Sequence, residues 1–317
     1  MDGHGRELLI LRHGQAESPY GKADLERELT DPGKRDIQRV GVHLQGRQWL
    51  PDATVVSPAT RTMITAEKTL KAGGRGIAAL TVDPRIYEAS AATLRHVLHD
   101  FAKAPPRVML VGHNPGVSEL VAFLSGRRIP MAPGMLARVA LPSEWTALHR
   151  GCGTLLDLVD PQTLPREFPF PGPGGSELRR RPAYYYVQSG VVPYRRSASG
   201  LEVLIIGSSK RKRWVMPKGI VTPGLTSQAS AAKEAREEAG IEGTVDGPSL
   251  GSFTYDKWGA SVTCEFFPME VHTVLDEAQW DESHRGRRWV DVDEATEMLG
   301  RDGLKRMVRA LAQRLRG

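Results

Sequence analysis

The chain of 317 residues is long enough for two domains, each with a hydrophobic core of its own. Its apolar fraction of 40% and charged fraction of 25% are typical of globular proteins. No apolar run approaches about 18 residues, and the first residues show no cleavage site of a secretory leader, so we expect neither a transmembrane helix nor a signal peptide.

The positive charge of the chain, with a net charge of +6 and a pI near 9.4, favours anionic partners. Three basic clusters stand out, and each is interpreted either as solvated surface or as a phosphate-binding site: Arg179 to Arg181, Lys210 to Arg213, and Arg285 with Arg287 and Arg288. No nucleic-acid-binding motif accompanies them, which disfavours a nucleic-acid partner.

The two cysteines, Cys152 and Cys264, lie far apart and lack the spacing of metal ligands, so a reducing cytoplasm is the expected location. Composition changes between residues 160 and 182, where proline and glycine predict an extended, non-helical connection. We therefore expect a first domain at 1–162, a linker at 163–182 and a second domain at 183–317.

The first half of the chain alternates strands with helices. Strands are predicted at 7–13, 53–57 and 107–113, and helices after Thr30, from Ser57 and Pro58, over 90–101, and after Asn114 and Pro115. The 90–101 helix should bury one face made of Leu94, Val97, Leu98 and Phe101. This alternation predicts an α/β fold with a largely parallel sheet.

Polar side chains follow three of these strands: Arg12 and His13, then Arg61, then His113. In an open α/β sheet, ligands bind outside the carboxyl ends of the strands, so we expect these four side chains to meet. Arginine binds phosphate with two parallel hydrogen bonds, and an unprotonated imidazole can attack phosphorus. A lone histidine at a strand end is usually incidental, but four converging groups favour a phosphoryl-transfer site.

The segments RHG (12–14), SPATRT and GHNPG resemble the histidine phosphatase superfamily, also called phosphoglycerate mutase-like, over residues 6 to 160. The resemblance implies a three-layer α/β fold, His13 as the nucleophile that forms a phosphohistidine, and a phosphate pocket made of Arg12, Arg61 and His113. The short domain is similar to the compact SixA-like branch, which is associated with phosphohistidine phosphatase activity. No cofactor is expected here.

Two further candidates in this half follow from the same resemblance. Glu88 stands where many relatives carry an acidic proton donor, although an ordinary carboxylate at a helix entry is the alternative. Asn114, next to His113, is a candidate for substrate binding.

The second half of the chain predicts an α+β domain with a mixed sheet. Strands are expected at 183–195 and 201–208, joined as a hairpin, and at 249–258, 261–274 and 287–292. The last helix carries a hydrophobic stripe, which we interpret as core: Leu304, Met307, Val308, Leu311 and Leu315.

Glu234, Glu237 and Glu238 are spaced i, i+3, i+4 on a helix predicted to begin near Thr226. Such carboxylates repel one another unless a cation binds them. Hard oxygen donors suit Mg²⁺ or Mn²⁺. The alternative is a solvated acidic helix with Lys233 and Arg236 as neighbours.

The segment 217–241 resembles the Nudix box, and the similarity to Nudix hydrolases covers residues 182 to 317. The matching residues are Gly219, Glu234, Glu237, Glu238, Gly240 and Ile241. Leu225 replaces a glutamate of the family pattern, and Lys233 replaces its arginine.

The resemblance to Nudix hydrolases implies that a metal-activated water attacks a diphosphate linked to another group. Glu237 and Glu238, with Glu234 close by, are the expected metal ligands, and the backbone carbonyl of Lys218 or Gly219 is expected to complete the set. Glu282, with Glu277 behind it, is the candidate for an additional catalytic glutamate. The candidates for phosphate binding are Lys218, Arg213, Arg285 and Arg287.

Three hypotheses about function follow. The first is a bifunctional phosphohydrolase that acts on nucleoside or dinucleoside polyphosphates, with a diphosphoinositol polyphosphate as the alternative Nudix substrate. The second is a protein-phosphohistidine phosphatase whose Nudix domain senses nucleotides. The third, a non-catalytic binding module, is disfavoured by the complete set of histidines and arginines. The expected partners are a phosphorylated small molecule or a phosphohistidine protein, with no membrane, and no oligomeric state is predicted.

Overall fold

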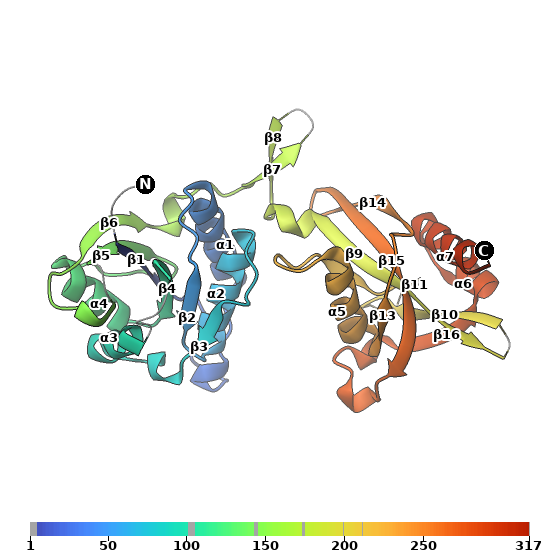
Figure 1. The fold of residues 1–317 in the computed structure, drawn as a ribbon, viewed down its shortest axis with the longest axis horizontal. Coiled ribbons are helices and arrows are strands. Elements are labelled where there is room, and N and C mark those ends of the chain that lie inside the picture. Colours follow the sequence, from blue (N-terminus) through green and yellow to red (C-terminus); the bar gives the residue numbers. More distant parts are fainter. Residues whose placement is uncertain are drawn as a thin grey trace. The chain divides into compact units, whose positions relative to one another are not determined.

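The computed structural model describes residues 5–100, 105–142, 145–172, 175–198, 200–210 and 212–316. The chain divides into two compact units, Met1–Phe168 and Pro169–Gly317. In Figure 1 the first unit runs from blue to green and the second from yellow to red. The division falls inside the segment predicted as a linker, and the limits of that linker stay a prediction.

A six-stranded sheet forms the centre of the described part of the first unit, in the order β3-β2-β4-β1-β5-β6. Its strands are β1 (Arg6–Arg12), β2 (Ala53–Val56), β3 (Leu80–Val82), β4 (Arg107–Gly112), β5 (Leu136–Leu141) and β6 (Thr154–Val159). The first four strands pair in parallel, in agreement with the largely parallel sheet that was predicted, although β3 itself was not predicted. β5 and β6 were also not predicted from the sequence, and they add to the sheet in antiparallel fashion.

Helices cover both faces of this sheet (Figure 1). They are α1 (Asp31–Gly46), α2 (Thr60–Ala72), α3 (Ala91–Asp100) and α4 (Gly116–Ser125), with short 3-10 helices η1 (Asp24–Glu26), η2 (Pro84–Ile86), η3 (Trp145–Ala147) and η4 (Pro161–Thr163). Leu8 and Ile10 of β1 pack with α3 and α4, whereas Leu9 and Leu11 pack with α1 and α2. This alternation of one strand between two cores gives the predicted three-layer architecture.

The helix starts follow the sequence signals with one exception. Thr30 caps α1, and its hydroxyl accepts a hydrogen bond from Gly33 N at 3.1 Å. The predicted start at Ser57 and Pro58 is wrong, because α2 begins at Thr60 after Ala59. The Ser57 hydroxyl instead lies 2.8 Å from His113 Nε2. Phe101, the last residue of the predicted stripe on α3, lies outside the described residues.

The second unit contains a mixed sheet of eight strands within its described residues. They are β9 (Val187–Ser197), β10 (Gly200–Gly207), β11 (Trp214–Val215), β12 (Lys218–Ile220), β13 (Ile241–Val245), β14 (Gly251–Lys257), β15 (Ala260–Val274) and β16 (Arg287–Asp291). The predicted hairpin of β9 and β10 is present, but residues 183–186, predicted as the start of its first strand, form a 3-10 helix instead. β9 and β15 pair in parallel, while their other pairings are antiparallel.

Helix α5 (Ser227–Ala239) packs on one side of this sheet, and α6 (Val292–Met298) and α7 (Asp302–Arg316) pack on the other (Figure 1). Short 3-10 helices are η5 (Ala183–Tyr186), η6 (Glu277–Gln279) and η7 (Ser283–Arg285). The predicted stripe on α7 is core, because Leu304, Met307, Val308 and Leu311 are buried and Leu315 packs against them.

A small hairpin of β7 (Phe168–Gly172) and β8 (Gly175–Arg179) lies in the segment for which the sequence indicated only an extended connection. The guanidinium carbon of Arg179 lies 3.4 Å from the ring centroid of Phe170 and 4.7 Å from that of Tyr186. Arg179 therefore packs between aromatic rings. Among the described residues, no helix combines the length and the hydropathy needed to cross a membrane.

Candidate active sites

The two histidines of the first unit follow neighbouring strands. Arg12 of β1 lies opposite Gly112 of β4, and His13 N donates to Gly112 O at 3.1 Å. Because β1 and β4 are parallel, His13 and His113 emerge at the same edge of the sheet. Their ring centroids are 5.3 Å apart.

Arg61 reaches the same place from the first turn of α2. Its side chain is buried, and Nη2 lies 3.3 Å from His113 Nδ1. Arg12 is anchored from the other side, where Nη1 donates to Met131 O at 2.8 Å. The structure thus brings the two histidines and Arg61 into contact, with Arg12 next to His13 in the chain.

Hydrogen bonds fix the protonation of both imidazoles. His13 Nδ1 lies 2.7 Å from Gly14 O, and a carbonyl can only accept, so Nδ1 carries the hydrogen and Nε2 keeps its lone pair. Arg61 can only donate, so His113 Nδ1 accepts and Nε2 donates to the Ser57 hydroxyl. His13 is thereby held as the tautomer whose Nε2 can act as a nucleophile.

Burial keeps both rings uncharged. It lowers the pKa of His13 to about 4, assisted by the charges of Arg61 and Arg12 and opposed by the bond to Gly14. Burial and the charge of Arg61 lower the pKa of His113 to about 3. At neutral pH the site therefore contains neutral imidazoles beside two guanidinium groups.

The arginines of this site have unused donors. Arg12 Nε and Arg61 Nε are buried and have no hydrogen-bond partner among the described residues. A buried donor without a partner is costly, and an anion that accepts from it removes that cost. The pair is therefore suited to phosphate oxygens.

Asp24 of η1, which was not predicted as a site residue, holds Arg61 in place. Its Oδ2 accepts from Tyr87 Oη at 2.7 Å and from Arg61 Nη2 at 2.8 Å, and Oδ1 accepts from Arg27 at 2.7 Å. These bonds hold the pKa of Asp24 well below its ordinary value, so the residue stays ionised. Asp24 lies in a three-residue 3-10 helix, which is too short to show periodicity, and no motif marks it.

Asp24→Asn should loosen Arg61 and weaken phosphate binding, because one charge-assisted acceptor is lost. We expect the inhibition constant of orthovanadate, an analogue of phosphate, to rise about tenfold. Inhibition of p-nitrophenyl phosphate hydrolysis in EDTA measures this constant. Glu26→Gln, an exposed carboxylate of the same short helix, is the matched control and should leave the constant unchanged. Equal constants for the two variants would show that Asp24 does not position Arg61.

The two other predicted site residues of this unit, Glu88 and Asn114, form no hydrogen bond with the two histidines or with Arg12 and Arg61 within the described residues. Glu88 is exposed, follows Tyr87 at a positive φ of 47°, and makes no hydrogen bond or ion pair within the described ranges. Asn114 donates to Met131 O at 2.9 Å and accepts from the Ser118 hydroxyl at 2.9 Å. Both polar ends of the Asn114 amide thus bind the protein itself.

The second unit has a cavity of about 560 Å³ at the N-terminal end of β12 and along α5. Glu234, Glu238, Lys218 and Gly219 line it, as do four other cations: Arg213, Lys257, Arg285 and Arg301. Acidic groups on α5 thus face a surrounding set of positive side chains, an arrangement suited to a metal ion and phosphate together.

Glu238 is the most firmly held of the three helix glutamates. Its carboxylate accepts from Lys218 N at 2.9 Å and from Arg285 Nη2 at 2.7 Å. Arg285 also pairs with Glu282 through Nε. The structure therefore joins Glu238 and Glu282 through one guanidinium, although 44 positions of sequence (282 minus 238) separate them.

Glu234 lies directly against Gly219. A Cβ at residue 219 would come within 2.0–2.3 Å of the Glu234 carboxylate, so any larger residue here would displace that carboxylate. Burial, together with the charge of Glu238, raises the pKa of Glu234 to about 7. A divalent cation between Glu234 and Glu238 would offset the repulsion of their negative charges. Carboxylate oxygens are hard donors, which suit such an ion.

Glu237 is not gathered with the other two. It pairs with Lys233 at 2.7 Å on the exposed side of α5 and is not part of the cavity wall. Within the described residues no group of three or more His, Cys, Asp or Glu side chains is clustered closely enough to form a metal site. Glu237 is paired with Lys233 and Glu238 with Arg285, so the two carboxylates face different partners.

Arg287 does not reach the cavity. Its guanidinium donates to Ala239 O at 3.0 Å and to Gly240 O at 2.8 Å, and it also bonds Leu275 O. The carbonyls of Ala239 and Gly240 lie at the C-terminal end of α5, where a cation is stabilising. Arg287, which was predicted to bind phosphate, thus binds the carbonyls at the end of α5 instead. The other three predicted phosphate-binding residues, Lys218, Arg213 and Arg285, do line the cavity.

Family comparisons match both units. The Histidine phosphatase superfamily (branch 1) matches residues 8–113, and the NUDIX domain matches residues 186–311. Nudix hydrolase 18, mitochondrial, from Arabidopsis thaliana is 33% identical over 136 residues, which cover 40% of this chain and 76% of that protein. The chain belongs to the Nudix family and carries an N-terminal histidine phosphatase domain.

Individual relatives match one domain each. The bis(5'-nucleosyl)-tetraphosphatase [asymmetrical] of Sus scrofa is 29% identical over 104 residues, or 32% of this chain and 71% of that protein. A solved structure of the protein histidine phosphatase SixA complexed with tungstate is 25% identical, covers 49% of this chain and 97% of that chain, and has a TM-score of 0.43. Both domain families are hydrolases, so the chain is a bifunctional phosphohydrolase.

The two residues that differ from the Nudix family pattern are Leu225 and Lys233, and neither lines the cavity. Leu225 is 45% exposed just before the N-cap residue Thr226 and is not part of the cavity wall. Lys233 pairs with Glu237. Four further cavity residues belong to no motif and were not predicted from the sequence: Tyr255, Lys257, Trp258 and Arg301.

Proposed function

We propose that the Nudix domain hydrolyses a pyrophosphate bond of a nucleoside or dinucleoside polyphosphate, and that the histidine phosphatase domain removes a phosphoryl group from a phosphorylated product. The observation that carries the second assignment is the neutral His13, with Nε2 unprotonated, beside buried arginine donors that lack partners.

In the phosphatase domain, His13 Nε2 attacks phosphorus, and a P–N bond forms while the P–O bond to the leaving group breaks. Arg12 and Arg61 bind the oxygens whose charge grows in the transition state. Glu88 gives its proton to the leaving oxygen and later accepts one from the water that hydrolyses the P–N bond. Inorganic phosphate and neutral His13 result.

In the Nudix domain, Glu234, Glu238 and the carbonyl of Gly219 would hold Mg²⁺ or Mn²⁺, which when bound supplies positive charge and acidifies water. Glu237 completes the proposed set, because its exposed pair with Lys233 is worth only about 0–1 kcal/mol and exchanges easily. Lys218, Arg213 and Arg285 neutralise phosphate oxygens, and Glu282 is the proposed base.

The nucleotide assignment draws on the relatives that the Nudix domain matches, one of which is named a bis(5'-nucleosyl)-tetraphosphatase. Fusion of the two domains supports a sequence in which the Nudix product becomes the phosphatase substrate. Cys152 and Cys264 are both free thiols, which supports a reducing, cytoplasmic location.

A product-mass screen of the full chain tests the proposal, with nucleoside triphosphates, dinucleoside polyphosphates, a diphosphoinositol polyphosphate and a phosphohistidine protein as substrates, each with Mg²⁺ or with EDTA. We expect pyrophosphate cleavage only with metal, and phosphate release from the nucleotide product also in EDTA. A Nudix product that accumulates and is never consumed would sink the sequential scheme. Phosphate release from the phosphohistidine protein alone would favour a protein phosphatase with a nucleotide-sensing Nudix domain.

A further inference from the structure

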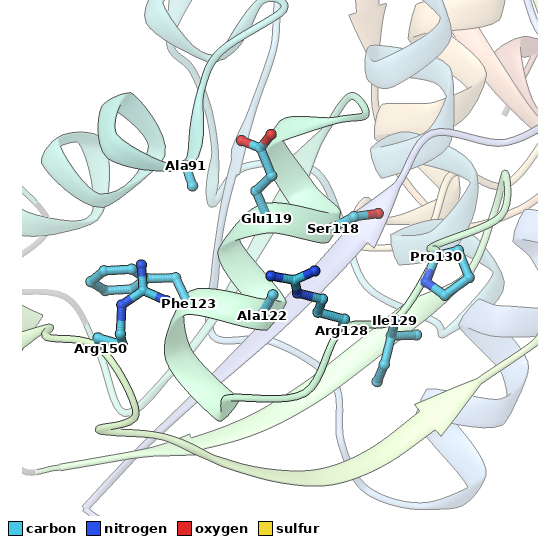
Figure 2. A pocket seen from close by; sticks show the side chains of 9 residues that line it. All are labelled: Ala91, Ser118, Glu119, Ala122, Phe123, Arg128, Ile129, Pro130 and Arg150. Atoms are coloured by element: carbon cyan, nitrogen blue, oxygen red, sulfur yellow. The ribbon is translucent and has the colours of Figure 1, made fainter.

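An open groove of about 620 Å³ lies along α4 of the phosphatase domain, outside the set of residues assigned to phosphoryl transfer. Figure 2 shows Ser118 and Pro130 toward one end, Phe123 and Arg150 toward the other, and Arg128 between them. Glu119 projects from the same helix near Ala91. None of the sequence motifs points to this groove.

The Ser118 end of the groove adjoins the phosphate site. The Ser118 hydroxyl donates to Asn114 Oδ1 at 2.9 Å and accepts from Met131 N at 3.1 Å. Met131 O in turn accepts from Arg12 Nη1 at 2.8 Å. Short hydrogen-bonded links therefore connect the groove wall to Arg12, which is next to His13 in the chain.

The groove carries charge that is not neutralised by the protein. Arg128 and Arg150 are exposed, and neither has an ion pair or a side-chain hydrogen bond within the described ranges. Two guanidinium groups that the protein leaves without acidic partners are suited to an anionic ligand.

The far end of the groove presents an aromatic platform. The guanidinium carbon of Arg150 lies 5.3 Å from the ring centroid of Phe123, and that of Arg95 lies 4.2 Å from it. Arg95 is fixed by a bond to Leu148 O at 3.0 Å. Both guanidinium groups lie over the Phe123 ring, and Arg150 is exposed, so its flat guanidinium can in turn stack a planar, electron-rich group such as a nucleobase.

We propose that this groove binds the part of a nucleoside phosphate that is not transferred, while the terminal phosphoryl group lies at His13. The remaining phosphate contacts Arg128, and the base stacks at Phe123 and Arg150. Glu119 accepts a hydrogen bond from a sugar hydroxyl. The inference rests on the proposed function of the phosphatase domain and specifies its substrate class.

The dimensions favour a small molecule over a protein partner. Ser118 and Phe123 are five helical positions apart, about 7.5 Å along α4, a span that a phosphate and a sugar can cover. The groove volume falls in the range of about 300–1,000 Å³ typical of small-molecule sites. Docking of a phosphohistidine protein would instead use a broad surface.

Inhibition of p-nitrophenyl phosphate hydrolysis by adenosine diphosphate tests the groove, using the full chain in EDTA. Arg128→Ala and Arg150→Ala should each raise the inhibition constant of adenosine diphosphate about tenfold. Arg127→Ala, an exposed neighbour outside the groove wall, is the matched control and should leave it unchanged. Phe123→Leu should weaken adenosine diphosphate more than inorganic diphosphate, which has no base.

An inhibition constant that is the same in both groove arginine variants and in wild type would overturn the proposal. So would inorganic diphosphate that binds wild type as tightly as adenosine diphosphate does. Loss of activity on a phosphohistidine protein without any change for adenosine diphosphate would assign the groove to protein docking instead. Hydrolysis of p-nitrophenyl phosphate that survives His13→Ala would refute the phosphatase mechanism itself, a separate result from any change in the groove.

Discussion

His13→Ala is expected to lower phosphate release in EDTA by about a thousandfold or more, because it removes the atom that forms the P–N bond. Metal-dependent pyrophosphate cleavage by the same variant should continue at the wild-type rate. Steady-state phosphate release and trapping of the acid-labile phosphoenzyme measure the effect. The variant should form no phosphoenzyme.

His99→Ala is the matched control, because this histidine is exposed at the end of α3. It should change neither activity. A His13→Ala enzyme that releases phosphate in EDTA within tenfold of wild type would exclude His13 as the nucleophile. An enzyme that loses both activities, with a lower melting temperature, would indicate a folding defect, and His13→Gln would then replace it.

The low pKa of His13 also sets the pH dependence of this reaction. Since that pKa is about 4, His13 stays unprotonated and the rate should be flat from about pH 5 to pH 8 as far as this group decides it. A histidine with the ordinary value of 6.5 would already be half protonated at pH 6.5. The free energy of unfolding should change at lower pH, between about 6.5 and 3.

The sign of the stability change follows from proton binding. Unfolded His13 and His113 bind protons near pH 6.5, whereas the folded chain binds them only near pH 4 and 3. Below pH 6.5 the unfolded state therefore holds more protons, and the free energy of unfolding falls as the pH drops. Above pH 6.5 both histidines are mostly unprotonated in the folded and the unfolded state, so they no longer make the free energy of unfolding depend on pH.

The phosphatase site could largely be predicted from the sequence, because its side chains follow strands. Arg12, His13 and His113 stand at the carboxyl ends of β1 and β4, and the parallel register of these strands places them together. Nothing comparable marks Asp24 or Ser57. Their contacts depend on the tertiary positions of η1 and of the segment before α2, and hydrophobic periodicity in the sequence does not predict such positions.

The Nudix site could be predicted only in part, because helical spacing fixes a face but not the partners of that face. Glu237 and Glu238 are adjacent, yet one pairs with a lysine of its own helix and the other with Arg285 from η7. Arg285 and Arg287 look equivalent in the sequence. Only one of them reaches the cavity, because Arg287 lies on β16 within reach of the carbonyls at the end of α5.

Glu238→Gln is expected to reduce metal-dependent pyrophosphate cleavage by about a thousandfold, while phosphate release in EDTA stays at the wild-type level. The charge is lost from the most enclosed carboxylate of the cavity, whose side chain is 13% exposed. The new amide can still accept from Lys218 N, but its NH₂ group cannot accept from Arg285. Binding of Mn²⁺, measured by electron paramagnetic resonance, should weaken in parallel.

Glu242→Gln is the matched control, because Glu242 pairs with Arg236 on the surface just beyond α5. It should leave both cleavage and Mn²⁺ binding unchanged. Glu237→Gln should have a smaller effect than Glu238→Gln, since Glu237 must first leave Lys233 to join the metal set. If Glu238→Gln cleaves pyrophosphate within tenfold of wild type and binds Mn²⁺ as tightly, the buried carboxylate serves only to hold Arg285 and Lys218. The metal would then have to bind elsewhere on the domain.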